Sequence, residues 1–181
     1  ALLPRAPAGK GSATCLDALP AAAALEGDVA YLDPPYNQHS YLGNYHVWET
    51  LVRWDAPEVY GTACKRIDCG ERRSPFNSRR RFRQARAELI AAVRAPVIVA
   101  SFSDEGFLSR AELEAMLATR GRVRVLANDY KRYVGAQIGI YDPQGRKVGT
   151  PGRLRNVEYL FVAAPHGVEL ELDGVERPPL W

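Results

Sequence analysis

Short apolar runs of strand length alternate with segments of helical spacing along the chain. The pattern predicts strands at four apolar runs, which are Val29–Asp33, Val97–Phe102, Arg122–Leu126 and Val157–Ala164. The run at 97–102 is continuous, which is typical of a strand covered on both faces of its sheet. We expect the strand at 29–33 to be buried as well.

Helices are predicted between these strands. The segment 45–53 has helical spacing, and we expect four of its apolar side chains to face inward, namely Val47, Trp48, Leu51 and the adjacent Trp54. The segment 83–93 is amphipathic and ends before Pro96, with one apolar stripe made of Ala85, Leu89 and Val93. Ser109 followed by Glu112 predicts a capping box for a helix that ends near Gly121.

Strands that alternate with helices indicate an α/β sheet. We expect one catalytic unit over residues 15–165, a flexible lead-in over 1–14, and a tail or small hairpin over 166–181 that turns at Asp173-Gly174. In open sheets of this class, ligands bind outside the carboxyl ends of the strands. Polar loops are predicted at three such ends, at residues 33–36, 101–106 and 129–133.

The composition is that of an ordinary globular domain. The chain has 181 residues, of which 46% are apolar and 25% charged, and no apolar stretch is long enough for a membrane span. Its three cysteines, Cys15, Cys64 and Cys69, are unevenly spaced. They favour a reducing compartment over a disulfide framework, and they lack the paired spacing of a zinc site. We therefore expect no membrane segment and no metal.

Positive charge is concentrated in one segment. Residues 65–86 contain nine Lys and Arg against two Asp and Glu, a net charge of +7 in a chain whose total is +3. Such a cluster is the electrostatic footprint of a polyanion such as DNA. A solvated arm is the alternative, because Pro75 to Ser78 interrupt the run. The predicted DNA contacts are Arg79, Arg80 and Arg81.

The strongest chemical signal is Asp33-Pro34-Pro35-Tyr36, directly after the apolar run 29–32. The prolines restrict the backbone, so the Asp33 carboxylate and the Pro34 carbonyl form a stiff pair of acceptors. This pair can receive both hydrogens of an exocyclic amine, and Tyr36 can stack on the ring that carries the amine. The alternative is a simple strand-ending turn, in which Asp and Pro are common.

A second candidate contact is the loop predicted after the strand at 122–126. Lys131 and Arg132 are flanked by Tyr130 and Tyr133, which suits phosphate binding next to aromatic stacking. The alternative is a turn with exposed cations.

The Asp33–Tyr36 segment after an apolar strand resembles motif IV of the amino-methyltransferases that act on adenine in DNA. The stretches Tyr41–His46, Asp55–Pro57, Ser101–Gly106, Tyr130–Gly135 and Glu158–Phe161 are similar to later parts of bacterial adenine-specific DNA methylases. The resemblance implies a Rossmann-like class I fold, S-adenosylmethionine as methyl donor without a metal, and double-stranded DNA with a flipped-out adenine as acceptor. It also implies a bacterial or phage protein that works in the cytoplasm.

The resemblance further assigns roles to individual residues. Asp33, Pro34, Pro35 and Tyr36 correspond to the catalytic motif, and Asp33 also to a donor contact. Asp17 occupies the place of the acidic residue that binds the donor's adenine amine. Tyr36 and Asn44 are expected to contact DNA.

One family feature is missing from the sequence, namely the glycine-rich donor loop that follows the first strand. Gly9-Lys10-Gly11-Ser12 does not replace it, because no strand precedes it. We therefore expect a sheet that lacks its N-terminal strands and that is completed by an absent N-terminal half or by a second subunit. Three alternatives stay open from the residues alone: an acceptor amine on cytosine, an RNA acceptor, and a non-enzymatic DNA-binding remnant or partner subunit.

Overall fold

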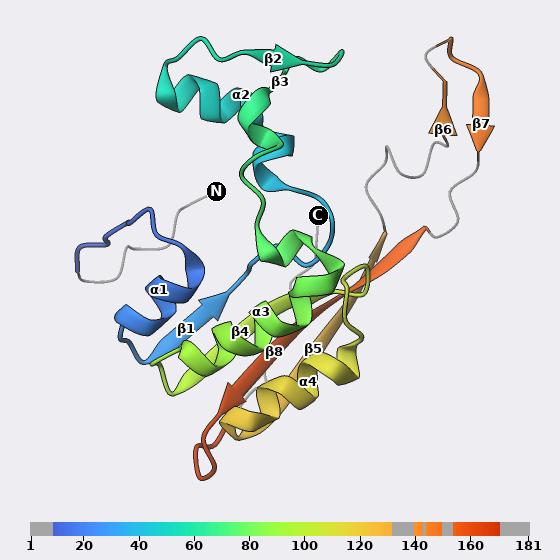
Figure 1. Cartoon of the computed structure of the whole chain (residues 1–181). Coiled ribbons are helices and arrows are strands. Elements are labelled where there is room, and N and C mark those ends of the chain that lie inside the picture. Colours follow the sequence, from blue (N-terminus) through green and yellow to red (C-terminus); the bar gives the residue numbers. More distant parts are fainter. Residues whose placement is uncertain (1–8, 132–139, 143, 150–153, 171–181) are drawn as a thin grey trace.

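A mixed four-stranded sheet is the centre of the molecule (Figure 1). The structure is a computed structural model that describes residues 9–131, 140–142, 144–149 and 154–170. The strand order is β1-β4-β8-β5. These strands are β1 (Val29–Leu32), β4 (Val97–Ser103), β8 (Arg155–Ala164) and β5 (Arg122–Lys131). β1 and β4 are parallel, whereas β8 runs antiparallel to both β4 and β5. All four predicted strands form, and the α/β class is confirmed.

Three helices of the described residues pack around the sheet. α3 (Arg79–Ala92) and α4 (Arg110–Leu117) lie on one face, in front of the strands in Figure 1, and α1 (Ala18–Ala24) lies beside the edge strand β1 and packs on α3. Along β4 the side chains alternate accordingly, with Ile98, Ala100 and Phe102 buried and the residues between them half-buried. The prediction of a strand covered on both faces is therefore wrong for the part of the chain that the structure describes.

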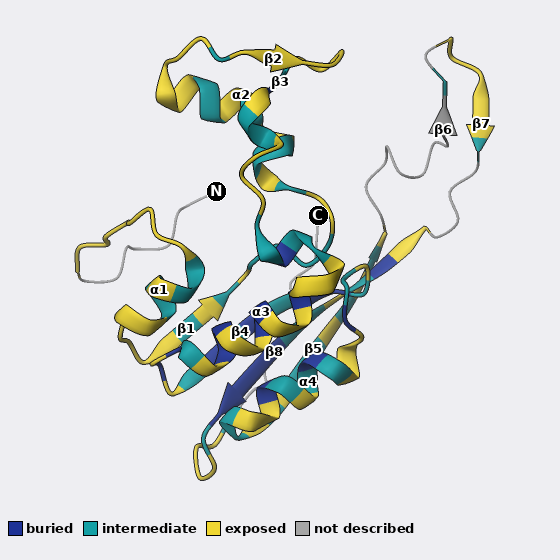
Figure 2. Ribbon diagram, viewed as in Figure 1, coloured by how far each residue is buried: buried dark blue, intermediate teal, exposed yellow. Residues whose placement is uncertain are grey.

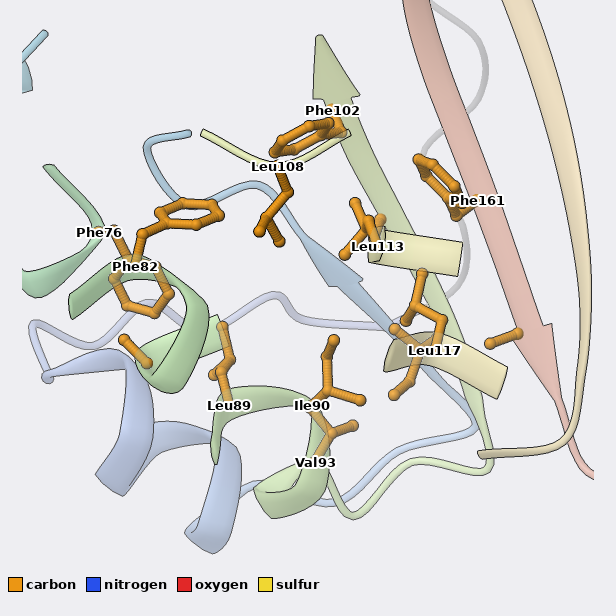
Figure 3. Packing of buried hydrophobic residues seen from close by; sticks show 14 of the residues in the cluster. Phe76, Phe82, Leu89, Ile90, Val93, Phe102, Leu108, Leu113, Leu117 and Phe161 are labelled. Atoms are coloured by element: carbon orange, nitrogen blue, oxygen red, sulfur yellow. The ribbon is translucent and has the colours of Figure 1, made fainter. Parts of the chain in front are cut away.

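The core fills the space between α3, α4 and the sheet (Figure 3). Its largest apolar side chains come from all of these elements and include Phe82, Ile90, Phe102, Leu113, Leu117 and Phe161. The predicted stripe of Ala85, Leu89 and Val93 is confirmed as buried. α3 begins at Arg79, four residues before the predicted start, which brings the fully buried Phe82 into its first turn.

Both ends of α4 follow the predicted pattern. Ser109 and Glu112 form the capping box, and the helix continues into a 3-10 turn, η3 (Ala118–Arg120). Gly121 then adopts φ +131°, a conformation that side chains disfavour, and it leads the chain back into β5. Arg120 donates from its guanidinium to the carbonyls of Ile90, Val93 and Ala95, which fixes the end of α3 against this turn.

β1 is an edge strand rather than a buried one. It pairs with β4 on one side only, and Val29 and Tyr31 are 57% and 61% exposed. A groove of about 480 Å³ follows the strand from Gly27 to Pro34 and is lined on its other sides by α1 and by the end of α3. The predicted burial of this strand is thus wrong within the described residues.

The segment after β1 forms a small unit that stands apart from the sheet (Figures 1 and 2). It consists of α2 (Tyr41–Arg53), β2 (Val59–Tyr60), β3 (Lys65–Arg66) and the 3-10 turn η1 (Ile67–Cys69). The four side chains expected to face inward are instead exposed: Val47, Trp48, Leu51 and Trp54. The sheet face is covered by α3 and α4, and among the described residues α2 packs mainly on β3 and η1 of its own unit.

Arg66 holds this unit together. Its buried guanidinium forms two hydrogen bonds of 2.6 and 2.9 Å with the Asp55 carboxylate and another of 3.1 Å with Asp68. Paired geometry of this kind suits arginine in particular. Arg66 therefore stabilises the fold of the α2 unit, and because it is buried it is not available to a polyanion at the surface.

Three shorter elements complete the described residues: the 3-10 turn η2 (Pro75–Asn77) and the hairpin strands β6 (Ile140–Tyr141) and β7 (Lys147–Gly149). Residues 9–14 of the predicted lead-in carry no helix or strand. The hairpin predicted at Asp173-Gly174 lies outside the described residues.

Candidate active site

The Asp33–Tyr36 loop lies at the carboxyl end of β1, next to the end of β4. The parallel register pairs Leu32 with Ala100, so Asp33 and Ser101 occupy the following pair of positions. The Ser101 hydroxyl donates a 2.7 Å hydrogen bond to Asp33 Oδ1. The Asp33 carboxylate is otherwise exposed, and this leaves acceptor capacity for a ligand.

Two further hydrogen-bonding contacts hold the loop in place. The amide of Phe107, in the loop after β4, donates to the Tyr36 carbonyl at 2.9 Å. The side-chain amide of Asn77, in η2, donates to the carbonyls of Asn37 and His39 at 2.9 and 3.0 Å. The loop and its continuation are thus held by residues that follow their partners by 38 positions or more.

Tyr36 packs edge-on against Phe102, with ring centroids 5.7 Å apart. The tyrosine is half-buried. Burial is the main reason why its pKa is raised to about 12, and nearby acidic and phenolic groups add to the effect, Tyr130 and Glu158 first among them. Its phenol is therefore neutral throughout the physiological pH range.

A cleft of about 720 Å³ opens beside this loop. Asp33 and Tyr36 line it together with Tyr31 and with Tyr41, the first residue of α2. The sheet contributes further polar side chains, Ser101, Asn128 and Glu158. Tyr41, Asn128 and Glu158 were not predicted as site residues, and Ser101 was predicted only as part of a polar loop at 101–106, of which residues 101–103 belong to β4. Within β4 the signal for Ser101 is a polar residue in an apolar strand, and the common location of the four residues depends on the strand register.

Other predicted site residues are not brought into this cleft. Asp17 is the N-cap of α1, and its carboxylate accepts from the Leu19 amide at 3.3 Å. It lines neither the cleft nor the groove beside β1, although its neighbour Ala18 lines the groove. Asn44 is exposed on α2 and does not line the cleft.

The loop predicted at 129–133 is wrong in its first part. Asp129, Tyr130 and Lys131 continue β5, and Lys131 pairs with Arg155 of β8. Lys131 is exposed, so it can still meet a partner, but from the end of a strand. Arg132 lies outside the described residues.

The basic segment divides into paired, buried and open residues. Arg72 forms an ion pair with Glu49, and Arg83 forms one with Glu112. Arg86 is fully buried, and its guanidinium has no hydrogen-bond partner among the described residues. Burial lowers the pKa of Arg86 to about 10, and the negative charge of Asp33 acts against this decrease. Several charges of the basic cluster at 65–86 are therefore paired or buried, while the predicted contacts Arg79, Arg80 and Arg81 are exposed.

Arg79, Arg80 and Arg81 form the first turn of α3 and are all exposed. The N-cap residue, Ser78, makes no side-chain hydrogen bond to the amides of this turn. The positive end of the helix dipole makes this an unfavourable place for three cations, and an anion bound there would remove the conflict.

Other predictions about the chain concern cysteines, metals and membranes. Cys15, Cys64 and Cys69 are all free thiols, as expected. The described residues contain no cluster of His, Cys, Asp and Glu suited to a metal ion. Among the same residues, no helix has the length and apolar character needed to cross a membrane.

Comparison with known proteins gives relatives of one kind. The chain is 34% identical to the type II methyltransferase M.FokI of Planomicrobium okeanokoites over 110 residues. The aligned region covers 59% of this chain and 17% of that protein. It is 30% identical over 112 residues to the modification methylase LlaI of Lactococcus lactis subsp. lactis, and the alignment covers 60% of this chain and 18% of that protein. It is 28% identical over 109 residues to the type II methyltransferase M.CviAII of Paramecium bursaria Chlorella virus 1, and the alignment covers 60% of this chain and 32% of that protein. The matched part of the chain thus spans less than a third of these relatives. No solved structure matches the chain significantly.

The family comparison includes the Asp33–Tyr36 loop, the α2 unit, α3 and β4. The model of the D12 class N6 adenine-specific DNA methyltransferases matches residues 10–116, more than half of the chain. The chain therefore belongs to the D12 class N6 adenine-specific DNA methyltransferase family.

Proposed function

We propose that the protein, at full length, transfers a methyl group from S-adenosylmethionine to the 6-amino group of adenine in DNA. The observation that carries this proposal is the Asp33–Tyr36 loop. Its carboxylate opens toward the cleft while the loop itself is fastened to β4, η2 and the segment at Phe107. Membership of the D12 class and the similarity to a type II methyltransferase and a modification methylase support the same reaction.

The chemistry requires acceptors for the amine hydrogens. The 6-amino nitrogen of adenine is a poor nucleophile because its lone pair is delocalised into the ring. The Asp33 carboxylate and the Pro34 carbonyl would accept its hydrogens and so localise the lone pair toward the methyl group. Rate enhancement then comes mainly from positioning and from preorganised electrostatics.

Tyr36 is the proposed stacking partner of the adenine. The base must leave the duplex to reach the cleft. Because the Tyr36 ring is braced by Phe102 and its phenol is neutral, it offers a fixed aromatic face. The neighbouring Tyr41 lines the same cleft and can contribute a second aromatic surface.

The cleft residues fit a cationic methyl donor. A sulfonium and an ammonium group are attracted by the carboxylates of Asp33 and Glu158, and by the faces of Tyr31, Tyr36 and Tyr41. When bound, S-adenosylmethionine supplies an electrophilic methyl group. Asp17, at the start of α1, is the further proposed donor contact, and no metal takes part in the proposal.

Within the α/β class, we propose that the sheet is Rossmann-like and that a further strand pairs with the free edge of β1. Exposed Val29 and Tyr31, and the groove beside them, support a partner along this edge. That strand, together with the glycine-rich donor loop, would come from another part of the protein or from a second polypeptide. For the described domain by itself we therefore expect weak donor binding.

Double-stranded DNA is the proposed partner, and the first turn of α3 is the proposed phosphate contact. Lys131 and Arg132 are assigned to the same partner, and Asn44 is assigned to the duplex near the flipped base. A DNA substrate and three free thiols together support a location in the cytoplasm of a bacterial or phage-infected cell. The relatives named as modification methylases support a place in restriction-modification.

Changing Arg79, Arg80 and Arg81 together to Ala tests the phosphate contact. We expect weaker DNA binding at low salt and a salt dependence flatter by about one unit of slope per lost contact. Thermal stability should change little, because the relief of removing three cations from the positive end of α3 is offset by loss of the contact between Arg79 and the Phe107 ring, 5.2 Å from its centroid. DNA affinity measured by anisotropy against salt concentration checks this.

The matched control is Arg94→Ala with Arg110→Ala, which removes exposed arginines that are ion-paired with Glu26 and Glu114. This control should leave the slope close to that of the parent protein. An unchanged slope in the triple variant would show that the three arginines in the first turn of α3 do not contact DNA phosphates.

Nucleoside mass spectrometry tests the reaction itself. DNA treated with the full-length protein and S-adenosylmethionine should gain N6-methyladenine. N4-methylcytosine as the product would move the acceptor to cytosine. Absence of any methylated base, with donor and DNA both bound, would favour a non-enzymatic DNA-binding role.

A further inference from the structure

Asp33 has one hydrogen-bond donor among the described residues, and this donor is the Ser101 hydroxyl. The contact follows from the strand register. β1 and β4 are parallel with Leu32 opposite Ala100, so the next residues of both strands project to the same face of the sheet. Both side chains line the same cleft. The hydrogen bond is therefore a consequence of the sheet and does not depend on a mobile loop.

A carboxylate on a strand end rotates freely unless it is held, because the terminal torsion of aspartate has a broad distribution. The 2.7 Å bond to Oδ1 fixes the plane of the Asp33 carboxylate. The second oxygen, Oδ2, then remains as the acceptor that is available to a ligand. Arg86 adds an attractive charge but makes no hydrogen bond, so it does not set the orientation.

We propose that Ser101 is a positioning residue, which orients the Asp33 carboxylate so that one oxygen faces the amine of the substrate. This inference rests on the proposed function, since Asp33 is useful to an amine only if an amine is the acceptor. Ser101 itself does not touch the reacting atoms. It acts by keeping the acceptor oxygen in line, and small errors of alignment lower transfer rates steeply.

The test is a single-turnover measurement of methyl transfer by the full-length protein and its variants. Ser101→Ala should lower the transfer rate constant about tenfold, which corresponds to the loss of one hydrogen bond to a charged group. The affinities for donor and DNA should stay within about twofold of the parent values. Ser101→Thr keeps the hydroxyl on a residue type that suits a strand, and it should retain most of the rate.

A double-mutant cycle separates positioning from a general structural effect. In an Asp33→Asn background the carboxylate is gone, so Ser101→Ala should add little further loss. An equal loss in both backgrounds, or an unchanged rate in Ser101→Ala alone, would overturn the positioning role while leaving the proposed function intact. Full activity of Asp33→Asn by itself would remove Asp33 from the mechanism and overturn the inference, whereas absence of methyl transfer by the parent full-length protein would overturn the proposed function.

A stability control keeps this test interpretable. Ser101 is half-buried, and its neighbours Ala100 and Phe102 on the strand carry the core contacts. We therefore expect the thermal midpoints of Ser101→Ala and Ser101→Thr to match that of the parent protein. A large decrease in the midpoint of both variants, with parallel loss of rate, would assign Ser101 to folding and contradict the proposal.

Discussion

Replacing Asp33 by asparagine is expected to lower methyl transfer by the full-length protein about a hundredfold to a thousandfold. The change exchanges one acceptor oxygen for an NH₂ group. Because Ser101 can still donate to the remaining oxygen, the new NH₂ group is directed toward the substrate amine, where two donors would meet. Transfer of a labelled methyl group to DNA under single-turnover conditions measures the effect.

DNA affinity should change by less than about twofold in Asp33→Asn, because this carboxylate makes no favourable contact with phosphate. The matched control is Asp28→Asn, the same chemical change just before the other end of β1. Asp28 is exposed and lines neither the cleft nor the groove, so near-normal transfer is expected. Near-normal transfer in Asp33→Asn as well would remove Asp33 from the mechanism.

Replacing Gly106 by alanine is expected to lower the free energy of unfolding of the domain by about 2–3 kcal/mol, because the added methyl group overpacks the core. A methyl group there would lie 2.7 and 2.8 Å from Cε1 and Cε2 of Phe102, and closer still to Cζ. The ring is 1% exposed and is braced by Phe82 and Tyr36. Movement of the ring would disturb its contacts with Tyr36 and Phe82, so methyl transfer should fall together with stability.

Chemical and thermal unfolding measure this destabilisation, with Gly27→Ala as the matched control. A methyl group at Gly27 meets only the Val29 carbonyl, at 3.9 Å, so a change of less than about 0.5 kcal/mol is expected there. Combining Gly106→Ala with Phe102→Leu should cost less than the sum of the two single changes, because the smaller side chain makes room. Strict additivity would contradict the packing argument.

The local features of the fold are encoded in short stretches of sequence. The patterns that predict the four strands, the buried stripe of α3 and the capping box at Ser109 are formed by residues at most a few positions apart. Each of these predictions is confirmed by the structure. The Asp33–Tyr36 loop belongs to the same group, because its stiffness comes from its own prolines.

Most of the predictions that are wrong concern which side of an element is covered. β1 is exposed because it pairs with β4 on one side only, and α2 lies away from the sheet face that α3 and α4 cover, which helical spacing could not predict. In the basic segment, the charges that are paired or buried likewise depend on distant residues. Arg66 and Arg86 differ from their exposed neighbours only through long-range burial, and Arg72 and Arg83 only through distant carboxylates.

By itself, the sequence determined the order of strands and helices, the position of the Asp33–Tyr36 loop and its resemblance to adenine methylases. Only the tertiary structure decided what surrounds that loop. Ser101, Asn128 and Glu158 come from three strands, and they share a cleft with Asp33 because of the order β1-β4-β8-β5 and the register of its pairs. Such pairings join residues that are separated by tens of positions, so their register is set by the packing of the whole sheet and not by local spacing.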